Sequence, residues 1–280
     1  MSKIYLKSIS IVVLLVLITT MPLFAQGTQT SIDTAQIIIL AKFNMPQLNR
    51  QRTIRVFLPK GYASSNKSYP VIYMTDGQNI FKTSAAIKNT WGVDSLLNTM
   101  PASKQCIIVG IDHAGKDRIT EYNPYDSNYG KGAGIVFIQF LAETLKPYID
   151  THYRTKKDAR YTAIAGSSMG SLLAMYAAVK YPETFGNAGI FSPAFWIGLQ
   201  IYTDTQASPF NKKSGFYFTC GDQESATMVN QVNKMDSLLH AKNFSFKQVP
   251  VATINVGAMH NETQWRGAFP AFYSWLIARF

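Results

Sequence analysis

Apolar and polar residues follow two distinct patterns along this chain. Runs such as 106–111 are apolar at successive positions but short, which is typical of strands buried on both faces of a sheet. Longer segments such as 135–153 repeat apolar residues every three or four positions, which predicts helices with one buried side. Together the patterns predict strands at residues 36–43, 52–58, 70–75, 106–111, 161–165, 188–191, 215–220 and 245–251, and helices at residues 91–100, 135–153, 169–181, 226–242 and 263–278.

The order of these elements predicts an α/β fold. Short apolar strands that alternate with helices form a mostly parallel central sheet, here of about eight strands, covered by helices on both faces. The first two strands are joined by a brief turn around Pro46 and Asn49, so we expect an antiparallel N-terminal edge. We find no linker inside residues 36–280. The polar stretch 115–134 is long for a connection in a compact domain, which favours a functional loop.

The first 25 residues have the layout of a secretory signal peptide. A basic start precedes an apolar core at 9–18, and Ala25 is a small residue at a suitable cleavage point. An uncleaved membrane anchor is the alternative, but the apolar run is nearer ten residues than the roughly 20 that span a bilayer. We therefore expect a signal peptide at 1–25, a mature domain at 26–280, and export to the periplasm or the medium.

Composition and charge narrow the classes of function. The 280 residues include 27 lysines and arginines against 16 aspartates and glutamates, a net charge of +11. No arginine-rich run, zinc-ligand spacing or RNA-binding signature accompanies this excess, so we expect a solvated basic surface and no nucleic-acid partner. Two cysteines cannot form a disulfide framework, and no period of 20–50 residues indicates a repeat protein.

The candidate nucleophile lies in Gly166-Ser-Ser-Met-Gly170, which matches G-x-S-x-G. The pattern alone is weak, but a predicted strand runs directly into it and a helix directly out, the setting in which a nucleophilic serine takes a strained backbone position. The helix N-terminus then points backbone N–H groups at an oxyanion. Ser168 is therefore predicted to be the nucleophile and the N–H of Met169 an oxyanion donor. A flexible Gly/Ser loop is the alternative.

A serine hydroxyl needs a base to take its proton, and that base needs a carboxylate to orient it. With this motif the chain order is serine, acid, histidine. His260 lies in a loop between the last predicted strand and the last helix, whereas His240 lies inside a predicted helix. Asp222 and Glu224 both follow the preceding strand, and either could serve as the acid. Asp236, in mid-helix, is a weaker candidate.

A second oxyanion donor is expected in the loop after the third strand. Asp76-Gly77-Gln78 occupies that place. Its glycine allows a sharp turn, so the backbone N–H of Gln78 would join that of Met169. An ordinary Asp-Gly turn is the alternative.

Several segments together resemble the esterase D-like family of α/β hydrolases, whose members include enterochelin esterases and feruloyl esterases. The resemblance covers nearly all of residues 35–280 and implies the α/β-hydrolase fold and esterase activity. It is carried by Tyr69-Pro-Val-Ile-Tyr-Met-Thr-Asp-Gly-Gln78, Ile108-Val-Gly-Ile-Asp112, Arg118-Ile-Thr-Glu-Tyr122, Ala165-Gly-Ser-Ser-Met-Gly170, Tyr181-Pro-Glu-Thr-Phe-Gly186, Ser192-Pro-Ala-Phe-Trp196 and His260-Asn-Glu-Thr-Gln-Trp265.

The resemblance also favours one acid over the other. In related feruloyl esterases a Cys-Gly-x-x-acid-Ser stretch carries the triad acid, and Cys220-Gly-Asp-Gln-Glu-Ser225 matches it, which favours Glu224 over Asp222. The sequence departs from the family's usual pattern at two positions, which bear on the subfamily to which it belongs. Ser171 stands where many relatives have a third glycine, and the acid is a glutamate rather than an aspartate.

Further residues have both a functional and a structural interpretation. Phe195 and Trp196 would form part of the acyl or alcohol pocket, unless their rings pack in the core. Arg118 and Glu121 could form an internal ion pair in the long loop. The two cysteines belong to strands that the family's order separates by several strand spacings, so a disulfide is not expected.

The sequence therefore predicts an exported serine esterase that uses Ser168, His260 and Glu224 and implies no metal or organic cofactor. Its substrate would be a small-molecule or carbohydrate ester, such as a siderophore ester or lactone, or an acyl or feruloyl group on a polysaccharide. One alternative is an acyltransferase on the same triad, and another is a non-catalytic carbohydrate-binding or envelope protein. Membrane contact is expected only through an uncleaved N-terminus, and the oligomeric state is not indicated.

Overall fold

The computed structural model describes residues 34–82, 89–209, 213–242 and 250–280. The chain divides into two compact units, Met1–Ile32 and Asp33–Phe280, and all described elements belong to the second. The predicted signal peptide therefore lies outside the described residues. Within the part of the chain that is described, no helix combines the length and the apolar character needed to cross a membrane.

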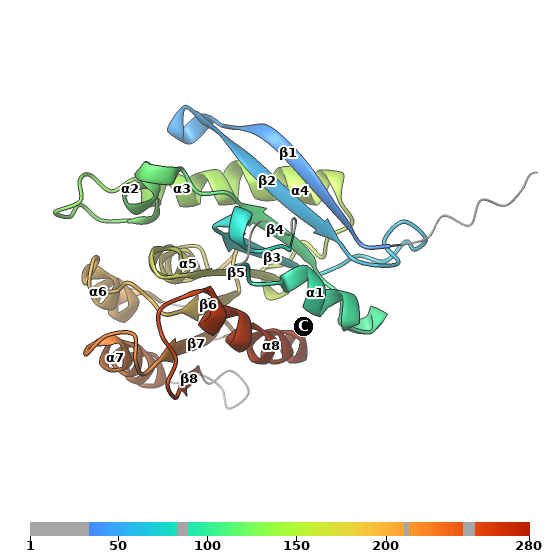
Figure 1. Cartoon of the computed structure of the whole chain (residues 1–280). Coiled ribbons are helices and arrows are strands. Elements are labelled where there is room, and N and C mark those ends of the chain that lie inside the picture. Colours follow the sequence, from blue (N-terminus) through green and yellow to red (C-terminus); the bar gives the residue numbers. More distant parts are fainter. Residues whose placement is uncertain (1–33, 83–88, 210–212, 243–249) are drawn as a thin grey trace, which may run out of the picture. The chain divides into compact units, whose positions relative to one another are not determined.

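The second unit is built on one eight-stranded sheet (Figure 1). The strand order is β1-β2-β4-β3-β5-β6-β7-β8, with β2 antiparallel to both β1 and β4 and every other neighbouring pair parallel. This confirms the predicted fold class, a mostly parallel sheet with an antiparallel N-terminal edge. The strands are β1 (Gln36–Met45), β2 (Arg50–Leu58), β3 (Val71–Thr75), β4 (Ile107–Ile111), β5 (Thr162–Ser167), β6 (Asn187–Phe191), β7 (Gly215–Gly221) and β8 (Val251–Asn255).

Helices cover both faces of this sheet, as predicted. Alternate side chains of β3 enter two separate cores, because successive residues of a strand point to opposite faces: Val71 and Tyr73 join one core, Ile72 and Met74 the other. The second core contains α1 (Val93–Thr99) and α8 (Glu262–Arg279). The first contains α2 (Arg118–Tyr122), α3 (Gly134–Gln139), α4 (Lys146–His152), α5 (Met169–Lys180), α6 (Gln200–Ala207) and α7 (Met228–His240).

Three parts of the secondary structure differ from the prediction. The helix expected at 135–153 is helical throughout, but its middle, Phe140–Leu145, has π-helical turns between α3 and α4. The last described strand is Val251–Asn255, which extends four residues beyond the strand predicted at 245–251; residues 245–249 of that prediction lie outside the described residues. All five residues of β8 are half-buried, because it is an edge strand, and this weakens the apolar pattern. Both α2 and α6 lie in segments not predicted to be helical.

The parallel strands bring distant segments to one edge of the sheet. Because β3, β5, β6, β7 and β8 run in the same direction, the loops that follow them lie along the same edge, where ligands bind in open α/β sheets. In chain order these loops carry the turn at Asp76, then Ser168, Ser192, Glu224 and His260.

Candidate active site

Ser168 lies between β5 and α5 in a strained backbone conformation. Its φ of 56° and ψ of −119° fall in a region that residues with a side chain rarely adopt. Gly166 and Gly170 make this turn possible, because a Cβ at either position would lie 2.2 or 2.1 Å from Thr75 Oγ1. The strand–turn–helix setting of G-x-S-x-G is therefore present as the sequence predicted.

Hydrogen bonds join the turn at Ser168 to the neighbouring strand β6 and the loop that follows it. The N–H of Ser168 donates to the carbonyl of Phe191 at 3.0 Å, and its own carbonyl accepts from the N–H of Ala194 at 3.1 Å. The hydroxyl of Ser171, fully buried, lies 2.6 Å from the carbonyl oxygens of both Gly166 and Phe191. Ser171 thus bridges β5 and β6 beneath the turn.

His260 is paired with Glu224. The ring Nδ1 of His260 lies 2.8 Å from Glu224 Oε2, and the Glu224 side chain is completely buried whereas that of His260 is 36% exposed. The indole of Trp265 meets the imidazole edge to face, with 5.3 Å between ring centroids. With Nδ1 engaged by a carboxylate, Nε2 is the nitrogen available to exchange a proton.

The second oxygen of Glu224 is held as well. Its Oε1 accepts from the hydroxyl of Ser192 at 2.7 Å and from the N–H of Gly221. The indole N–H of Trp265 donates to the same Ser192 hydroxyl at 2.8 Å. No such role was predicted for Ser192 or Trp265, because the contact joins two loops and the first turn of α8, which lie far apart in the sequence. Both residues belong to segments that carry the family resemblance, Ser192–Trp196 and His260–Trp265.

Asp222, the other candidate acid, has a different partner. Its Oδ1 accepts from the N–H of Gly257 at 2.7 Å, and its own N–H donates to Asn255. These bonds join the loop after β7 to the loop that leads to His260. Asp236 lies in α7, 3.5 Å from His240. The structure thus brings Glu224 to His260 and gives both alternatives other contacts.

The two expected oxyanion donors lie at the starts of helical turns. Met169 is the first residue of α5, and Gln78 the second of a 3₁₀ turn, Gly77–Asn79. The first N–H groups of a helix have no intrahelical acceptor. Gly77 is required there, because its Cβ would lie 2.7 Å from the backbone carbonyl carbon of Gly110. The side chain of Gln78 faces away from this role and accepts from the N–H of His113 at 3.1 Å.

The expected ion pair between Arg118 and Glu121 is not what the structure contains. Arg118 binds Asp76 through two hydrogen bonds of 2.6 and 2.9 Å, and Glu121 binds Arg52 at 2.8 Å. Burial lowers the pKa of Arg118, but the hydrogen bond and charge of Asp76 outweigh it and the pKa is raised overall. The prediction was wrong because Arg118 reaches the turn after β3 and Glu121 reaches β2, so each side chain has a partner of opposite charge outside α2.

Of the two predicted pocket residues, one is exposed. Phe195 is fully buried and its ring packs against Tyr202 at 5.6 Å, so the core-packing alternative describes it. Trp196 is 54% exposed and contacts the ring of Tyr129 edge to face at 6.3 Å. It borders a shallow hollow of about 420 Å³ with Ile197, Leu199, Gln200 and Thr203.

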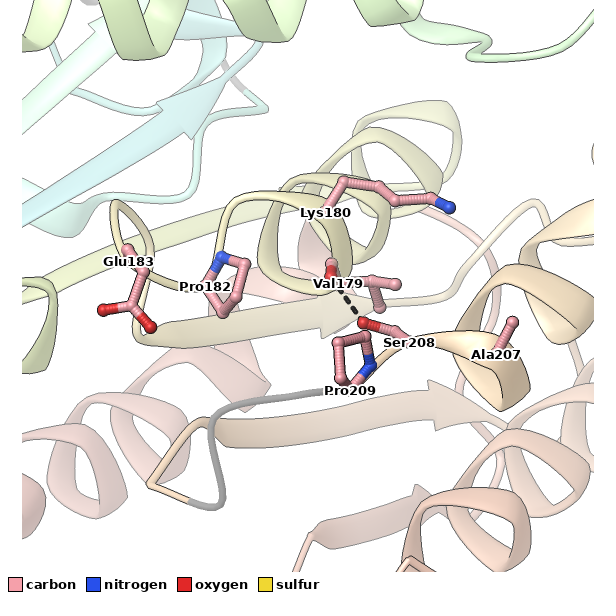
Figure 2. A pocket seen from close by; sticks show the side chains of 7 residues that line it. All are labelled: Val179, Lys180, Pro182, Glu183, Ala207, Ser208 and Pro209. Carbon is pink, nitrogen blue, oxygen red and sulfur yellow. Dashed lines mark hydrogen bonds between the residues drawn. The ribbon is translucent and has the colours of Figure 1, made fainter.

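A larger hollow lies at the opposite end of α5. It measures about 630 Å³, and Figure 2 shows the Ser208 hydroxyl within it donating to the carbonyl of Val179. Because α5 has twelve residues, this end of the helix is about 17 Å from Met169, and the hollow contains none of the predicted site residues. Its lining is Val179, Lys180, Pro182, Glu183, Ala207, Ser208 and Pro209.

Comparison with known proteins gives a family and a fold. The family described as "Putative esterase" matches residues 45–276. The uncharacterized protein YbbA of Bacillus subtilis is 21% identical over 243 residues, which cover 81% of this chain and 93% of YbbA. A solved ferulic acid esterase superposes with a TM-score of 0.69 at 19% identity, covering 88% of this chain and 99% of that one. The enterobactin esterase FES from Shigella flexneri superposes with a TM-score of 0.63 at 19% identity, covering 88% and 59%.

Proposed function

Since this chain belongs to the esterase family described as "Putative esterase" and is an ester-hydrolysing enzyme, we propose that Ser168, His260 and Glu224 form its catalytic triad. One observation carries the proposal. Nδ1 of His260 lies 2.8 Å from a fully buried Glu224 carboxylate, in loops at the same edge of the sheet as the strained turn of Ser168. A buried carboxylate against an imidazole supports the orientation and charge that a general base requires.

In this mechanism Ser168 Oγ attacks the carbonyl carbon of the ester while His260 Nε2 takes its proton. The negative charge that develops on the carbonyl oxygen is stabilised by the N–H groups of Met169 and Gln78. The bond to the alcohol then breaks, the alcohol leaves with the proton from His260, and the acyl group stays on Ser168. Water attacks this acyl-enzyme with His260 again as base, which releases the acid and restores the serine.

Two substrate classes are supported by the names of the superposed structures. They are an ester of ferulic acid and an ester or lactone of the enterobactin type. Both offer a flat aromatic ring. Trp196 lies two residues after Ala194, whose N–H donates to the Ser168 carbonyl, and its exposed indole is suited to bind such a ring.

The decisive variant is Ser168→Ala. The parent protein should hydrolyse p-nitrophenyl acetate and butyrate, and Ser168→Ala should lose at least ~10³-fold in kcat without a change in its unfolding temperature. Ser167→Ala, the neighbouring hydroxyl, is the matched control and should retain activity. Equal hydrolysis by the parent and Ser168→Ala would contradict the proposal. Methyl ferulate and ferric-siderophore substrates distinguish the two classes, and a competing alcohol acceptor distinguishes hydrolysis from acyl transfer.

We propose further that residues 1–25 are a signal peptide and that the mature enzyme begins at Gln26. The basic start, apolar core and small residue at position 25 support this. Expression of the whole chain in a bacterial host, followed by fractionation and N-terminal sequencing, should give an exported protein that starts at Gln26. Full-length protein retained in the membrane fraction would contradict cleavage.

A further inference from the structure

One arginine contacts both backbone segments that carry the proposed oxyanion donors. Arg118 binds the carboxylate of Asp76 with Nε and one terminal nitrogen, at 2.6 and 2.9 Å. The same terminal nitrogen lies 3.4 Å from the carbonyl oxygen of Ser167. Asp76 comes two residues before Gln78, and Ser167 two residues before Met169. A single planar guanidinium therefore spans the two halves of the oxyanion site.

The Asp76 turn needs this support. Asp76 has a φ of 58° and a ψ of 45°, the left-handed region that residues other than glycine rarely adopt. Its side chain is only 8% exposed, and its N–H donates to the hydroxyl of Tyr122 at 3.2 Å. Such conformations persist only where the surroundings over-determine them. Here Arg118 and Tyr122, both on α2, hold the side chain and the backbone of the same residue.

We propose that Arg118 is a positioning residue for ester hydrolysis, which holds the N–H groups of Gln78 and Met169 at the separation that the oxyanion requires. The inference rests on the proposed triad mechanism. The charge of Arg118 is neutralised by Asp76, so the arginine acts by fixing the positions of the two segments. Its two parallel hydrogen bonds to Asp76 hold the plane of the guanidinium, which a lysine could not do. The two N–H groups must be held in place before the oxyanion forms. A small displacement of one of them therefore lowers kcat and leaves the binding of the substrate largely unchanged.

The chain offers a matched control on the same helix. Glu121 binds Arg52 at 2.8 and 2.9 Å, with side chains 1% and 10% exposed, and also contacts Arg50. This pair ties α2 to β2 and touches neither half of the oxyanion site. Glu121→Gln therefore removes a comparable buried ion pair from α2 without disturbing the Asp76 turn.

The experiment compares Arg118→Ala, Arg118→Lys and Glu121→Gln in the full-length enzyme. Hydrolysis of p-nitrophenyl butyrate by Arg118→Ala should show kcat lowered about 10²-fold, the effect of losing one oxyanion donor, with KM within about threefold. Arg118→Lys should stay folded and still lose at least about tenfold in kcat, because a single ammonium cannot bind Asp76 in two places. Guanidinium, far below denaturing concentrations, should restore part of the rate to Arg118→Ala, and sodium chloride at equal ionic strength should not.

Three results would overturn the inference. They are a kcat within threefold of the parent in both Arg118 variants, an equal loss of kcat in Glu121→Gln, or a folded Arg118→Ala enzyme that guanidinium fails to accelerate. Ser168→Ala in the same assay separates this failure from that of the triad. If Ser168→Ala is inactive and the Arg118 variants are fully active, the triad stands and the positioning role falls. If Ser168→Ala is active, the triad itself is wrong.

Discussion

Glu224→Gln would remove the charge of the proposed acid with almost no change in shape. The carboxylate is completely buried, and both of its oxygens accept hydrogen bonds. Oε2 faces Nδ1 of His260 at 2.8 Å, whereas Oε1 faces two donors, the hydroxyl of Ser192 and the N–H of Gly221. A glutamine amide has one oxygen and one NH₂ group, so it can replace only one of these acceptors.

The structure decides which way the amide must point. The backbone N–H of Gly221 can only donate, and an NH₂ group beside it would leave buried donors facing each other, at a cost of about 1–3 kcal/mol. The amide oxygen therefore takes the place of Oε1, and the NH₂ group faces His260. Nδ1 must then accept a hydrogen bond, which leaves the ring proton on Nε2, the nitrogen that should receive the serine proton.

The expected loss follows from this reversed tautomer. An acid-to-amide change in a Ser-His-Asp triad lowers kcat about 10⁴-fold for the same reason. The ring of His260 is 36% exposed, so water can help it to recover the active tautomer. We therefore expect Glu224→Gln to lose about 10³- to 10⁴-fold in kcat, or about 4–5.5 kcal/mol in the barrier, with KM within about threefold.

Initial rates with p-nitrophenyl butyrate test this prediction, together with thermal unfolding of each variant. Asp222→Asn is the matched control, because it removes a carboxylate only two residues from Glu224. The amide oxygen of the asparagine can still accept the hydrogen bond from the N–H of Gly257. It should lose less than about tenfold in kcat. A Glu224→Gln enzyme within tenfold of the parent, or a greater loss in Asp222→Asn, would refute the reasoning.

Gly221→Ala should lower stability by about 1–3 kcal/mol, and with it the esterase activity, because its Cβ would lie 2.0 Å from the carbonyl oxygen of Ala258 in the loop that carries the histidine. Gly267→Ala is the control: Gly267 lies in α8 with open space around its Cβ position, so this variant should have the same Tm as the parent or a higher one. An equal fall in Tm in both variants would show that the close approach of Ala258 to Gly221 does not determine the effect. Trp196→Ala should raise KM about 2- to 10-fold for methyl ferulate but not for methyl acetate; a rise for both esters counts against ring binding. Burial raises the pKa of both cysteines to about 12, so a thiol reagent at pH 8 should label neither in the folded enzyme and both in urea. Rapid labelling of native protein would show that one of them is accessible.

Local pattern was sufficient for some elements and not for others. The strand before Ser168 was predicted to within two residues and the helix after it to within one, because apolar runs and the glycines of the motif act over a few neighbouring positions. The edge strand β8 was placed too early, since its half-buried residues lack a strong apolar run. The short helix α6 was missed, because eight mostly polar residues carry little periodicity and are stabilised by packing against the rest of the fold.

The amino-acid sequence alone predicted a mostly parallel sheet, a strained turn at Ser168 and a histidine in the loop before the last helix. Each of these features depends on residues that are close together in the chain. The residues by themselves left both Glu224 and Asp222 open as the acid, and the family resemblance favoured Glu224. Only the tertiary structure showed that Glu224 faces His260, and that Arg118 binds Asp76 rather than Glu121. These contacts join residues 36 and 42 positions apart. Whether such residues meet depends on strand order and on the path of each loop, and the spacing of residues in one segment carries no information about either.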